Sequence, residues 1–447
     1  MMLGDPQQVH RNGVWSGKPP AFAVGRQSPA RAPGPTTRSL SHDTESHPFG
    51  KLNLMAELSV RYTYRLRVSH TAEALLLAEW GRDRWVWNEC VARSKALRLA
   101  GEQCGPARLD KDLTQARSGN GWLRMGSSVP QQQTIRDFGA ARAKAIKDIS
   151  DRLPMKQRRG FPTLKKKALA RPSMTYTRNG FSLKGGRLCL AGGIELSVVW
   201  SRDLPSVPTS VRISRDPTGT WWASFVVKRE LEPLPATNRV IGVDWGVTET
   251  ATTTNESFDL PHAQHGKAAA AKLARYQKMM ARRRPAKGKP GSRGYRTAKR
   301  QAARAYAKVA RQRRDDARKW AKAVVVNHDQ IAVEDFHPKF LAKSTMARKA
   351  ADGAIGQAKR ELIWMATKHG RDLRLVAPAY TTMDCGNCDA RAKHRLPLDE
   401  RTYTCESCGT IKPRDRNSAT VMVVRAGFNP AGVDRVRLDS PKGNRAA

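Results

Sequence analysis

Acidic residues are scarce in this chain of 447 residues. Aspartate and glutamate number 39 against 81 lysine and arginine residues, so the formal charge at pH 7 is +42. An excess of this size favours a polyanionic partner, because a basic surface gains affinity by releasing counterions from phosphates. Nucleic acid is the natural partner, and an anionic membrane surface is the alternative.

Long hydrophobic runs are missing as well. No run of about 18 apolar residues could span a bilayer, and no compact apolar segment near the start could act as a secretion signal. These absences predict a soluble, intracellular (cytoplasmic) protein without a membrane partner. Cysteine is also rare, and Cys90, Cys104 and Cys189 lie scattered in ordinary segments, so a disulfide framework is not expected.

The first half of the chain changes its pattern twice. Residues 1–54 are rich in Pro, Gly, Ser and Arg without apolar periodicity, which predicts a disordered tail, and Met55 is a candidate true start. Alternating apolar residues predict a strand over 57–69, and helical spacing follows in two segments. Short β-like runs broken by Gly and Pro then predict a small β-barrel or sheet. The two predicted helices cover 71–100 and 130–152, and the β-rich region covers 159–235.

Strands and helices alternate in the second half, which is typical of an α/β core. Buried strands are predicted at 239–246 and 330–335, separated by a long, mostly helical segment, residues 272–320. A helix near 356–370, a strand and a final helix over 416–427 complete the pattern. At 447 residues the whole chain is long enough for two or three domains.

Four cysteines stand in two CxxC pairs, Cys385 with Cys388 and Cys405 with Cys408, sixteen residues apart. Two residues between ligands let one tight turn direct both sulfurs at one ion, and the second pair completes the tetrahedron that Zn²⁺ prefers. Four thiolates leave no open coordination position. The pattern therefore predicts a structural zinc that holds an insert too small for its own core.

Three carboxylates are candidates for a second metal site. Asp244 and Glu334 each stand at the carboxyl end of an apolar strand, and Asp415 stands at the start of the last helix. If the strands are neighbours, the acids converge into a cluster that repels itself unless divalent metal is present. Two Mg²⁺ ions about 4 Å apart would support phosphodiester hydrolysis. Taken singly, each acid is equally explained as a turn former or helix cap.

The basic segment 272–320 contains 19 Lys and Arg but only two acids. A solvated helical hairpin would explain a charged run, but exposed helices usually pair opposite charges at i,i+4. We therefore expect a phosphate or heteroduplex track along this segment. The candidate contacts in its loop are Arg282, Arg283, Arg284, Lys287 and Lys289.

These motifs, in their order, resemble the RuvC-like nucleases of the TnpB and compact type V CRISPR effector family. The resemblance rests on GVDWG at 242–246, AVED at 332–335, the cysteine pairs and DRNSA at 415–419. Upstream, YRLRVSHTAEALLLAEWGRDRWVWNE is similar to the N-terminal segment of that family, and RGFPTLKKK to its Gly-Phe-Pro and lysine motif. The resemblance covers residues 57–427.

The resemblance implies a monomeric ribonucleoprotein that binds a guide RNA and cuts double-stranded target DNA beside a short motif read by the protein. Asp244, Glu334 and Asp415 match the catalytic, Mg²⁺-binding acids, the four cysteines match the zinc ligands, and Lys165 and Lys166 match nucleic-acid contacts. The implied fold is α+β and multidomain, with an RNase H-like (RuvC) α/β nuclease domain, an inserted zinc ribbon, a β-barrel wedge domain and a helical recognition domain.

The implied domains follow the chain in this order: a disordered tail over 1–54, the wedge over 55–70 and 159–235, the recognition domain over 71–158, the nuclease over 236–380 and 411–428, the zinc ribbon over 381–410 and an irregular tail over 429–447.

Two positions depart from the family pattern. Pro413 replaces the first acid of the usual Asp-Arg-Asp, which affects local turn geometry or cleavage rate, and Asp389 stands where Gly is common in the first cysteine turn. An RNA-guided DNA-binding protein with weak or no cleavage is therefore an alternative. A transposon accessory protein or a guide-free nuclease is another.

Overall fold

The computed structural model describes residues 58–286, 289–337, 341, 344–397 and 399–429. The predicted tail at 1–54, Met55, Lys287 and all but the first residue of the predicted tail at 429–447 lie outside these residues. Within the described residues, no helix combines the length and apolar character needed to cross a membrane.

The amino-terminal part contains one sheet of seven strands in the order β2-β6-β7-β1-β5-β4-β3, and every pairing is antiparallel. The strands are β1 (Leu58–Arg67), β2 (Ser173–Thr177), β3 (Phe181–Lys184), β4 (Arg187–Leu190), β5 (Ile194–Val199), β6 (Ser210–Arg215) and β7 (Trp221–Arg229). The two edge strands, β2 and β3, are joined only by the short 3₁₀ helix η1 (Arg178–Gly180). Since consecutive residues cannot be far apart, the sheet curls until its edges approach, and it is nearly closed.

The predicted strand at 57–69 is confirmed as β1, and its alternation explains the packing. Val60, Tyr64 and Leu66 are buried, whereas Arg61 and Arg65 between them are exposed. Side chains of a strand alternate between its two faces, so one face of β1 contributes to the core inside the curled sheet.

Four helices interrupt this sheet in sequence: α1 (His70–Leu99), α2 (Pro106–Gly119), α3 (Gly121–Arg124) and α4 (Ser128–Ser150). They share a second core that includes Leu109, Ile135 and Phe138. Helix α1 is capped by the Ser69 hydroxyl, which accepts a hydrogen bond from Ala72 N at 3.1 Å. The sequence predicted helices over 71–100 and 130–152 but missed α2 and α3, whose apolar periodicity is short.

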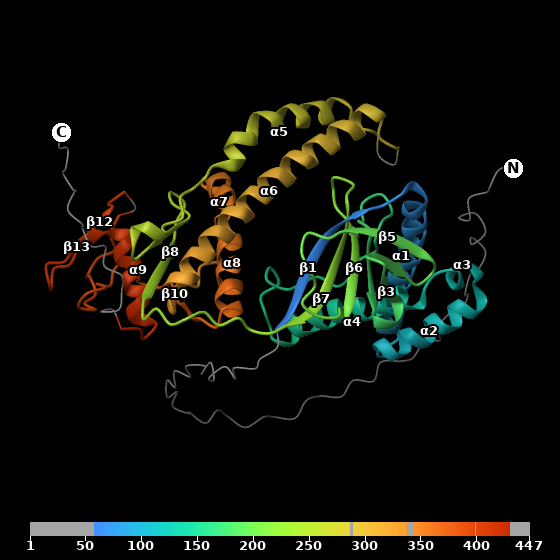
Figure 1. Ribbon diagram of the computed structural model, residues 1–447, viewed down its shortest axis with the longest axis horizontal. Helices are drawn as coiled ribbons and strands as arrows, with labels where there is room; N and C mark the ends of the chain where they lie inside the picture. Colours follow the sequence, from blue (N-terminus) through green and yellow to red (C-terminus); the bar gives the residue numbers. More distant parts are fainter. Residues whose placement is uncertain (1–57, 287–288, 338–340, 342–343, 398, 430–447) are drawn as a thin grey trace, which may run out of the picture. The chain divides into compact units, whose positions relative to one another are not determined.

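A second sheet has four strands in the order β11-β10-β8-β9 (Figure 1). Strands β8 (Val240–Trp245), β10 (Gln330–Glu334) and β11 (Asp372–Val376) are parallel, and β9 (Ala251–Thr253) is antiparallel to β8. The predicted buried strands at 239–246 and 330–335 are confirmed as β8 and β10. The expected α+β fold is confirmed at this level.

The two faces of this sheet are covered by different helices. Ile241, Val243 and Val333 pack on α6 (Arg293–Asn327) and α8 (Ile355–Lys368). The alternate residues, including Val240 and Ala332, pack on α9 (Arg414–Arg425). Because side chains alternate along a strand, Asp244 and Glu334 share the face that α9 covers.

Helix α9 approaches β8 more closely than a side chain permits. A Cβ atom on Gly242 would lie 1.9 Å from the carbonyl oxygen of Ala419 in α9. Glycine is therefore required here for contact between backbones. This contact sets the distance between α9 and β8, the strand that bears Asp244 next to its last residue.

Helix α5 (His265–Arg282) runs alongside α6 as an antiparallel hairpin, as predicted for the basic segment (Figure 1). Small residues such as Ala298 and Ala302 are buried between the two helices. The remaining elements are η2 (Glu256–Phe258), α7 (Ala347–Gly353) and the hairpin of β12 (Thr402–Thr404) with β13 (Ile411–Pro413).

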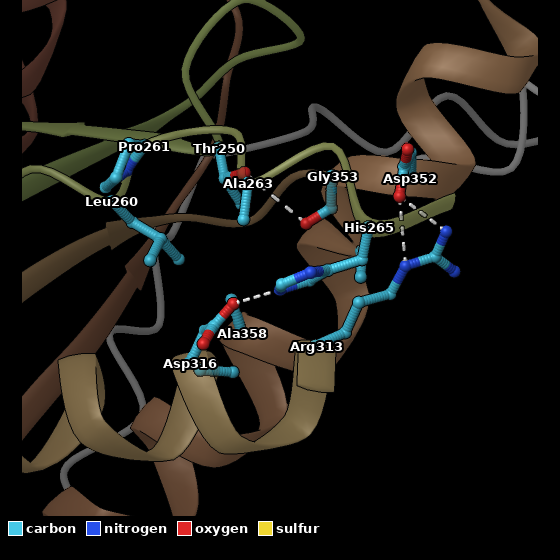
Figure 2. Close-up of a pocket in the computed structure, with 12 residues that line it drawn as sticks. Thr250, Leu260, Pro261, Ala263, His265, Arg313, Asp316, Asp352, Gly353 and Ala358 are labelled. Atoms are coloured by element: carbon cyan, nitrogen blue, oxygen red, sulfur yellow. Dashed lines mark hydrogen bonds and ion pairs between the residues drawn. The ribbon is translucent and has the colours of Figure 1, made fainter. Parts of the chain in front are cut away.

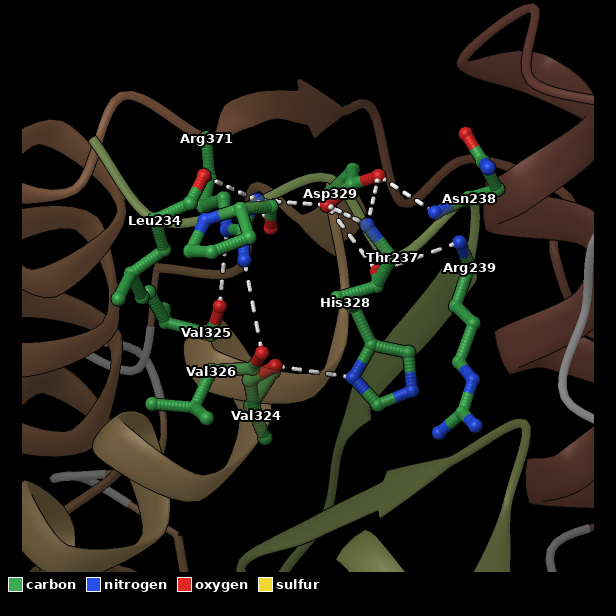
Figure 3. Close-up of polar contacts among 11 residues, drawn as sticks. Leu234, Thr237, Asn238, Arg239, Val324, Val325, Val326, His328, Asp329 and Arg371 are labelled. Carbon is green, nitrogen blue, oxygen red and sulfur yellow. Dashed lines mark hydrogen bonds and ion pairs between the residues drawn. The ribbon is translucent and has the colours of Figure 1, made fainter.

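Asp329 joins the starting ends of the three parallel strands (Figure 3). It precedes β10 and accepts hydrogen bonds from Asn238 N at 2.6 Å and from Thr237 N, just before β8. Arg371, just before β11, donates to it at 2.6 Å. Burial opposes the charge of this carboxylate, but these donors together hold the pKa of Asp329 below its ordinary value.

Gly242→Ala should lower the melting temperature by about 5 °C or more, because overpacking costs about 1–3 kcal/mol. Differential scanning calorimetry checks this. The matched control is Gly119→Ala at the exposed end of α2, where a Cβ meets nothing within 4 Å. Equal melting temperatures for the two variants would contradict the close contact.

Asp329→Asn should reduce the free energy of unfolding by about 2 kcal/mol at pH 7, because a charged acceptor is lost. A carboxylate with a lowered folded pKa stabilises fully above its ordinary pKa of 3.8 and loses this effect as pH falls through the folded value. The difference in the free energy of unfolding between Asp329→Asn and wild type should therefore narrow from pH 7 toward pH 3, as measured by urea titrations. The exposed Asp151→Asn is the control, and a pH-independent difference would refute the role of the charge.

Candidate functional site

Two of the three predicted acids meet at the carboxyl ends of β8 and β10. The strands pair in parallel with Val243 opposite Val333, so Asp244 and Glu334 are adjacent one step further on. Their carboxyl groups share a hydrogen bond. Glu334 also accepts from Trp245 N at 3.3 Å, and its carbonyl oxygen accepts from Trp245 Nε1 at 3.0 Å. The indole thus fixes the two strand ends together.

The electrostatics of this pair are those of two acids forced together. Burial, then the charges of Glu334 and Asp415, raise the pKa of Asp244 well above its ordinary value. Burial also raises the pKa of Glu334. Two carboxyl groups at such a distance share a proton unless a cation replaces it. Their oxygens are the ligands that hard divalent cations prefer, so the residues fit such an ion.

Asp415, the third acid, lies in the first turn of α9 and is directed partly elsewhere. Its carboxylate contacts Arg414 Nε at 3.6 Å and Arg401 Nη1 at 3.7 Å. Its charge reaches Asp244, but the three acids are not among the described groups whose ligand atoms all lie within 4.8 Å of one another. For Asp415 to join a shared ion, its carboxylate has to exchange these arginines for the cation.

The four cysteines do form a compact group, with all sulfurs within 4.8 Å of one another. The Sγ atoms of Cys385 and Cys408 are 3.7 Å apart, and those of Cys388 and Cys405 are 3.6 Å apart. A tetrahedron of thiolates with metal–sulfur bonds of about 2.3 Å has sulfurs about 3.8 Å apart. The predicted pairs are therefore arranged as a zinc site requires.

The two cysteine turns have the same backbone form despite their different sequences. Gly409 N donates to Cys405 O at 2.9 Å, and Asp389 N donates to Cys385 O at 3.0 Å. Both residues have left-handed backbones, with φ of 68° and 59°. Aspartate tolerates this conformation better than most residues, so the departure at Asp389 leaves the turn intact.

The first cysteine turn holds α9 in place. Asn417, which is fully buried, accepts a hydrogen bond from Gly386 N at 3.0 Å and donates one to Asp384 O at 2.8 Å. A Cβ on Gly386 would lie 2.7 Å from Thr420 Cβ. The metal-binding turn and the helix that bears Asp415 are thus in direct contact.

The predicted basic contacts differ in their exposure. Arg282, Arg283, Arg284 and Lys289 are exposed at the end of α5 and in the loop after it. Lys166 is exposed too. Lys165 is half-buried, because its ammonium lies 3.5 Å from the ring centre of Trp87 and 5.6 Å from that of Trp80. Burial lowers the pKa of this lysine.

A cavity of about 20 Å³ lies between α5, α6 and α7 (Figure 2). Asp352 closes it by accepting from Gly266 N at 2.6 Å and from Arg313 Nη2 at 2.7 Å, and His265 pairs with Asp316 at 2.5 Å. The volume is close to that of one water probe, which excludes a small-molecule substrate here. Sequence patterns did not reveal this cluster, because its members His265 and Asp352 are 87 residues apart.

Comparison with known proteins adds a sequence-based assignment. Residues 213–345 match a family model described as a probable transposase, and residues 356–422 match the Cas12f1-like TNB domain. A protein of Streptomyces pristinaespiralis named "Putative RNA-guided DNA endonuclease" is 29% identical over 378 residues, which cover 82% of this chain and 89% of that protein. These matches agree with the resemblance to TnpB proteins and compact type V CRISPR effectors.

Other similar proteins show comparable coverage. The Escherichia coli K12 protein "Putative RNA-guided DNA endonuclease InsQ" is 25% identical, over 80% of this chain and 90% of that protein. A Cas12f1–sgRNA–target DNA complex matches with 11% identity and a TM-score of 0.48, over 83% of this chain and 99% of that one. The mini-endonuclease CRISPR-Cas_phi3 matches with 9% identity and a TM-score of 0.43, over 84% and 93%. The resemblance rests on the sequence matches alone.

Proposed function

We propose that this protein is an RNA-guided DNA endonuclease in which Asp244, Glu334 and Asp415 hold divalent metal, Mg²⁺ being the candidate. The observation that carries the proposal is the adjacency of Asp244, which is half-buried, and Glu334, which is buried, at the carboxyl ends of neighbouring parallel strands. The names of both curated relatives agree with this activity.

Each part of the chain has a role in this proposal. The nearly closed sheet is the wedge and α1–α4 form the recognition part, while the four-stranded sheet with α5–α9 is the RuvC-like nuclease. A guide RNA pairs with double-stranded target DNA, and the protein works as a monomeric ribonucleoprotein. The exposed lysine and arginine side chains of the α5–α6 hairpin provide a surface for phosphates. The two acids of this segment do not neutralise them, because Asp315 pairs with Lys319 and Asp316 pairs with His265.

Two changes at the three acids have to precede metal binding. The pKa values of Asp244 and Glu334 are both raised, so both carboxyl groups have to be ionised before their oxygens can act as ligands. Asp415 has to exchange its contacts with Arg401 and Arg414 for the cation, which leaves the exposed Arg401 available to substrate phosphates, while Arg414 stays buried and bound to Pro397 O. Magnesium ions, when bound, supply activation of a water and stabilisation of the leaving oxygen.

A second candidate function is RNA-guided DNA binding with weak or no cleavage, for example in transcriptional interference or as a transposon accessory. The ion pairs that hold Asp415 away from the other two acids favour it, as does Pro413, which offers no side-chain cap to α9. Incubating the ribonucleoprotein with target plasmid and Mg²⁺ separates the two candidates. Target binding without nicking would select this one.

Asp244→Ala should reduce guide-dependent cleavage by about 100-fold or more while guide RNA binding stays unchanged, because the divalent cation loses one of its ligands. Cleavage is measured on plasmid with Mg²⁺, and guide binding by filter retention. Asp372→Ala, at the opposite end of the same sheet, is the matched control. Full cleavage by the Asp244 variant would remove the assignment.

The chain should also carry one structural Zn²⁺ ion, held by Cys385, Cys388, Cys405 and Cys408. Cys405→Ala should leave less than about a tenth of the zinc bound, because an incomplete tetrahedron loses most of its binding free energy. Mass spectrometry of the purified protein counts the metal. Cys189→Ala in β4 should retain all of it, and zinc retention by the Cys405 variant would exclude the site.

A further inference from the structure

The first turn of α9, which bears Asp415, has no helix cap of its own. Its N-cap residue is Pro413, whose ring has no acceptor for the free amide groups of the turn. An uncapped first turn frays readily, and fraying would move Asp415. Some other contact has to fix this turn relative to the sheet.

Arg416, the residue after Asp415, makes that contact. Its Nη1 donates to Thr253 O at 2.6 Å and to Asp259 Oδ1 at 3.2 Å, and its Nη2 donates to Asp259 Oδ2 at 2.9 Å. This fork-to-carboxylate geometry is the most direction-specific ion pair that arginine makes. Both side chains are mostly buried, at 22% and 16% exposure.

Asp259 is rigidly held on its other side. It accepts from Thr253 N at 2.6 Å and from Thr253 Oγ1 at 3.2 Å. Thr253 belongs to β9, where its neighbour Thr252 pairs directly with Asp244 in β8. Arg416, which follows Asp415, is therefore bound to Thr253 and Asp259. Thr253 in turn follows Thr252, the residue of β9 that pairs with Asp244.

The carboxylate of Asp415 contacts two other arginines. Arg401 and Arg414 draw its carboxylate away from the acid pair, and Arg414 is itself bound to Pro397 O at 2.9 Å in the cysteine insert. Arg416 holds the backbone of the same turn against β9. The Arg416–Asp259 contact thus acts on the turn beside Asp415, in addition to the Gly242 and Asn417 contacts further along α9 and the bond from Arg414 N to Arg401 O at 2.7 Å.

We propose that Arg416 and Asp259 form a clamp that positions Asp415 for divalent-cation binding with Asp244 and Glu334. Arg416 acts through Asp415 and is a positioning residue. This inference rests on the proposed metal site, and it adds a requirement that the three acids alone do not contain.

The test measures cation binding directly in the full-length, zinc-loaded protein, with Mn²⁺ as the probe and electron paramagnetic resonance of free Mn²⁺ as the readout. Arg416→Met should raise the dissociation constant about tenfold, the usual effect of losing a contact that orients a metal ligand. Arg416→Lys, which keeps one charged donor, should recover part of the affinity. Asp244→Ala gives the background.

The matched control is Arg374→Met. Arg374 ties the far end of α9 to β11 by donating to Ala426 O at 2.7 Å and pairing with Asp372 at 2.6 Å. Loosening that end should leave Mn²⁺ affinity within about twofold of wild type if the clamp acts locally. In cleavage assays, only the Arg416 variants should need more Mg²⁺ for half-maximal rate while binding guide RNA normally.

Three results would overturn the clamp. Mn²⁺ affinity of Arg416→Met equal to wild type would remove it, and so would an equal loss in Arg374→Met, because α9 would then act only as a packed helix. Wild-type protein that binds no more Mn²⁺ than Asp244→Ala would overturn the proposed metal site itself, and the clamp with it.

Discussion

The contact between the backbones of α9 and β8 at Gly242 is the constraint on which the candidate site depends. The face of the sheet that α9 covers is the face that Asp244 and Glu334 share, and the helix brings the third acid to that face. The cysteine turn packs on the outer side of the same helix through Asn417. A helix that stood further from the sheet would separate the metal-ligand candidates and the zinc insert together.

The carboxylates of this protein differ in their contacts and in the direction of their pKa shifts. In a chain with so few acids, several carboxylates each anchor more than one element: Asp329 joins three strand starts, Asp352 joins α5 and α6, and Asp384 is held by Arg391 and Arg425. Burial disfavours the charge of each, yet their donors hold the pKa values of all three below the ordinary value. Asp244 and Glu334 are the opposite case, since their pKa values are raised. Burial also raises the pKa values of Asp83 and Glu79, so it is the adjacency of two carboxyl groups at the strand ends that distinguishes the candidate cation site.

Sequence patterns predicted the elements well wherever a local period was strong. The strand at 57–69, the buried strands ending in Asp244 and Glu334 and the helical hairpin of the basic segment are all present. The CxxC pairs were equally readable, because two residues fix the approach of two sulfurs within one turn. Helices α2, α3 and α7 and strand β9 were missed, since each is too short or too polar to show a period.

What the sequence by itself determined is therefore the longer elements with a strong local period, the two cysteine pairs and the order of the acids along the chain. Only the tertiary structure decided that Asp415 pairs with Arg401 and Arg414, that Lys165 lies over Trp87, and that Arg416 reaches Asp259. Periodicity reports which face of an element is apolar, because that depends on neighbours within a few residues. The partner of a polar side chain 157 residues away depends on how the packed elements meet, and no local pattern encodes it.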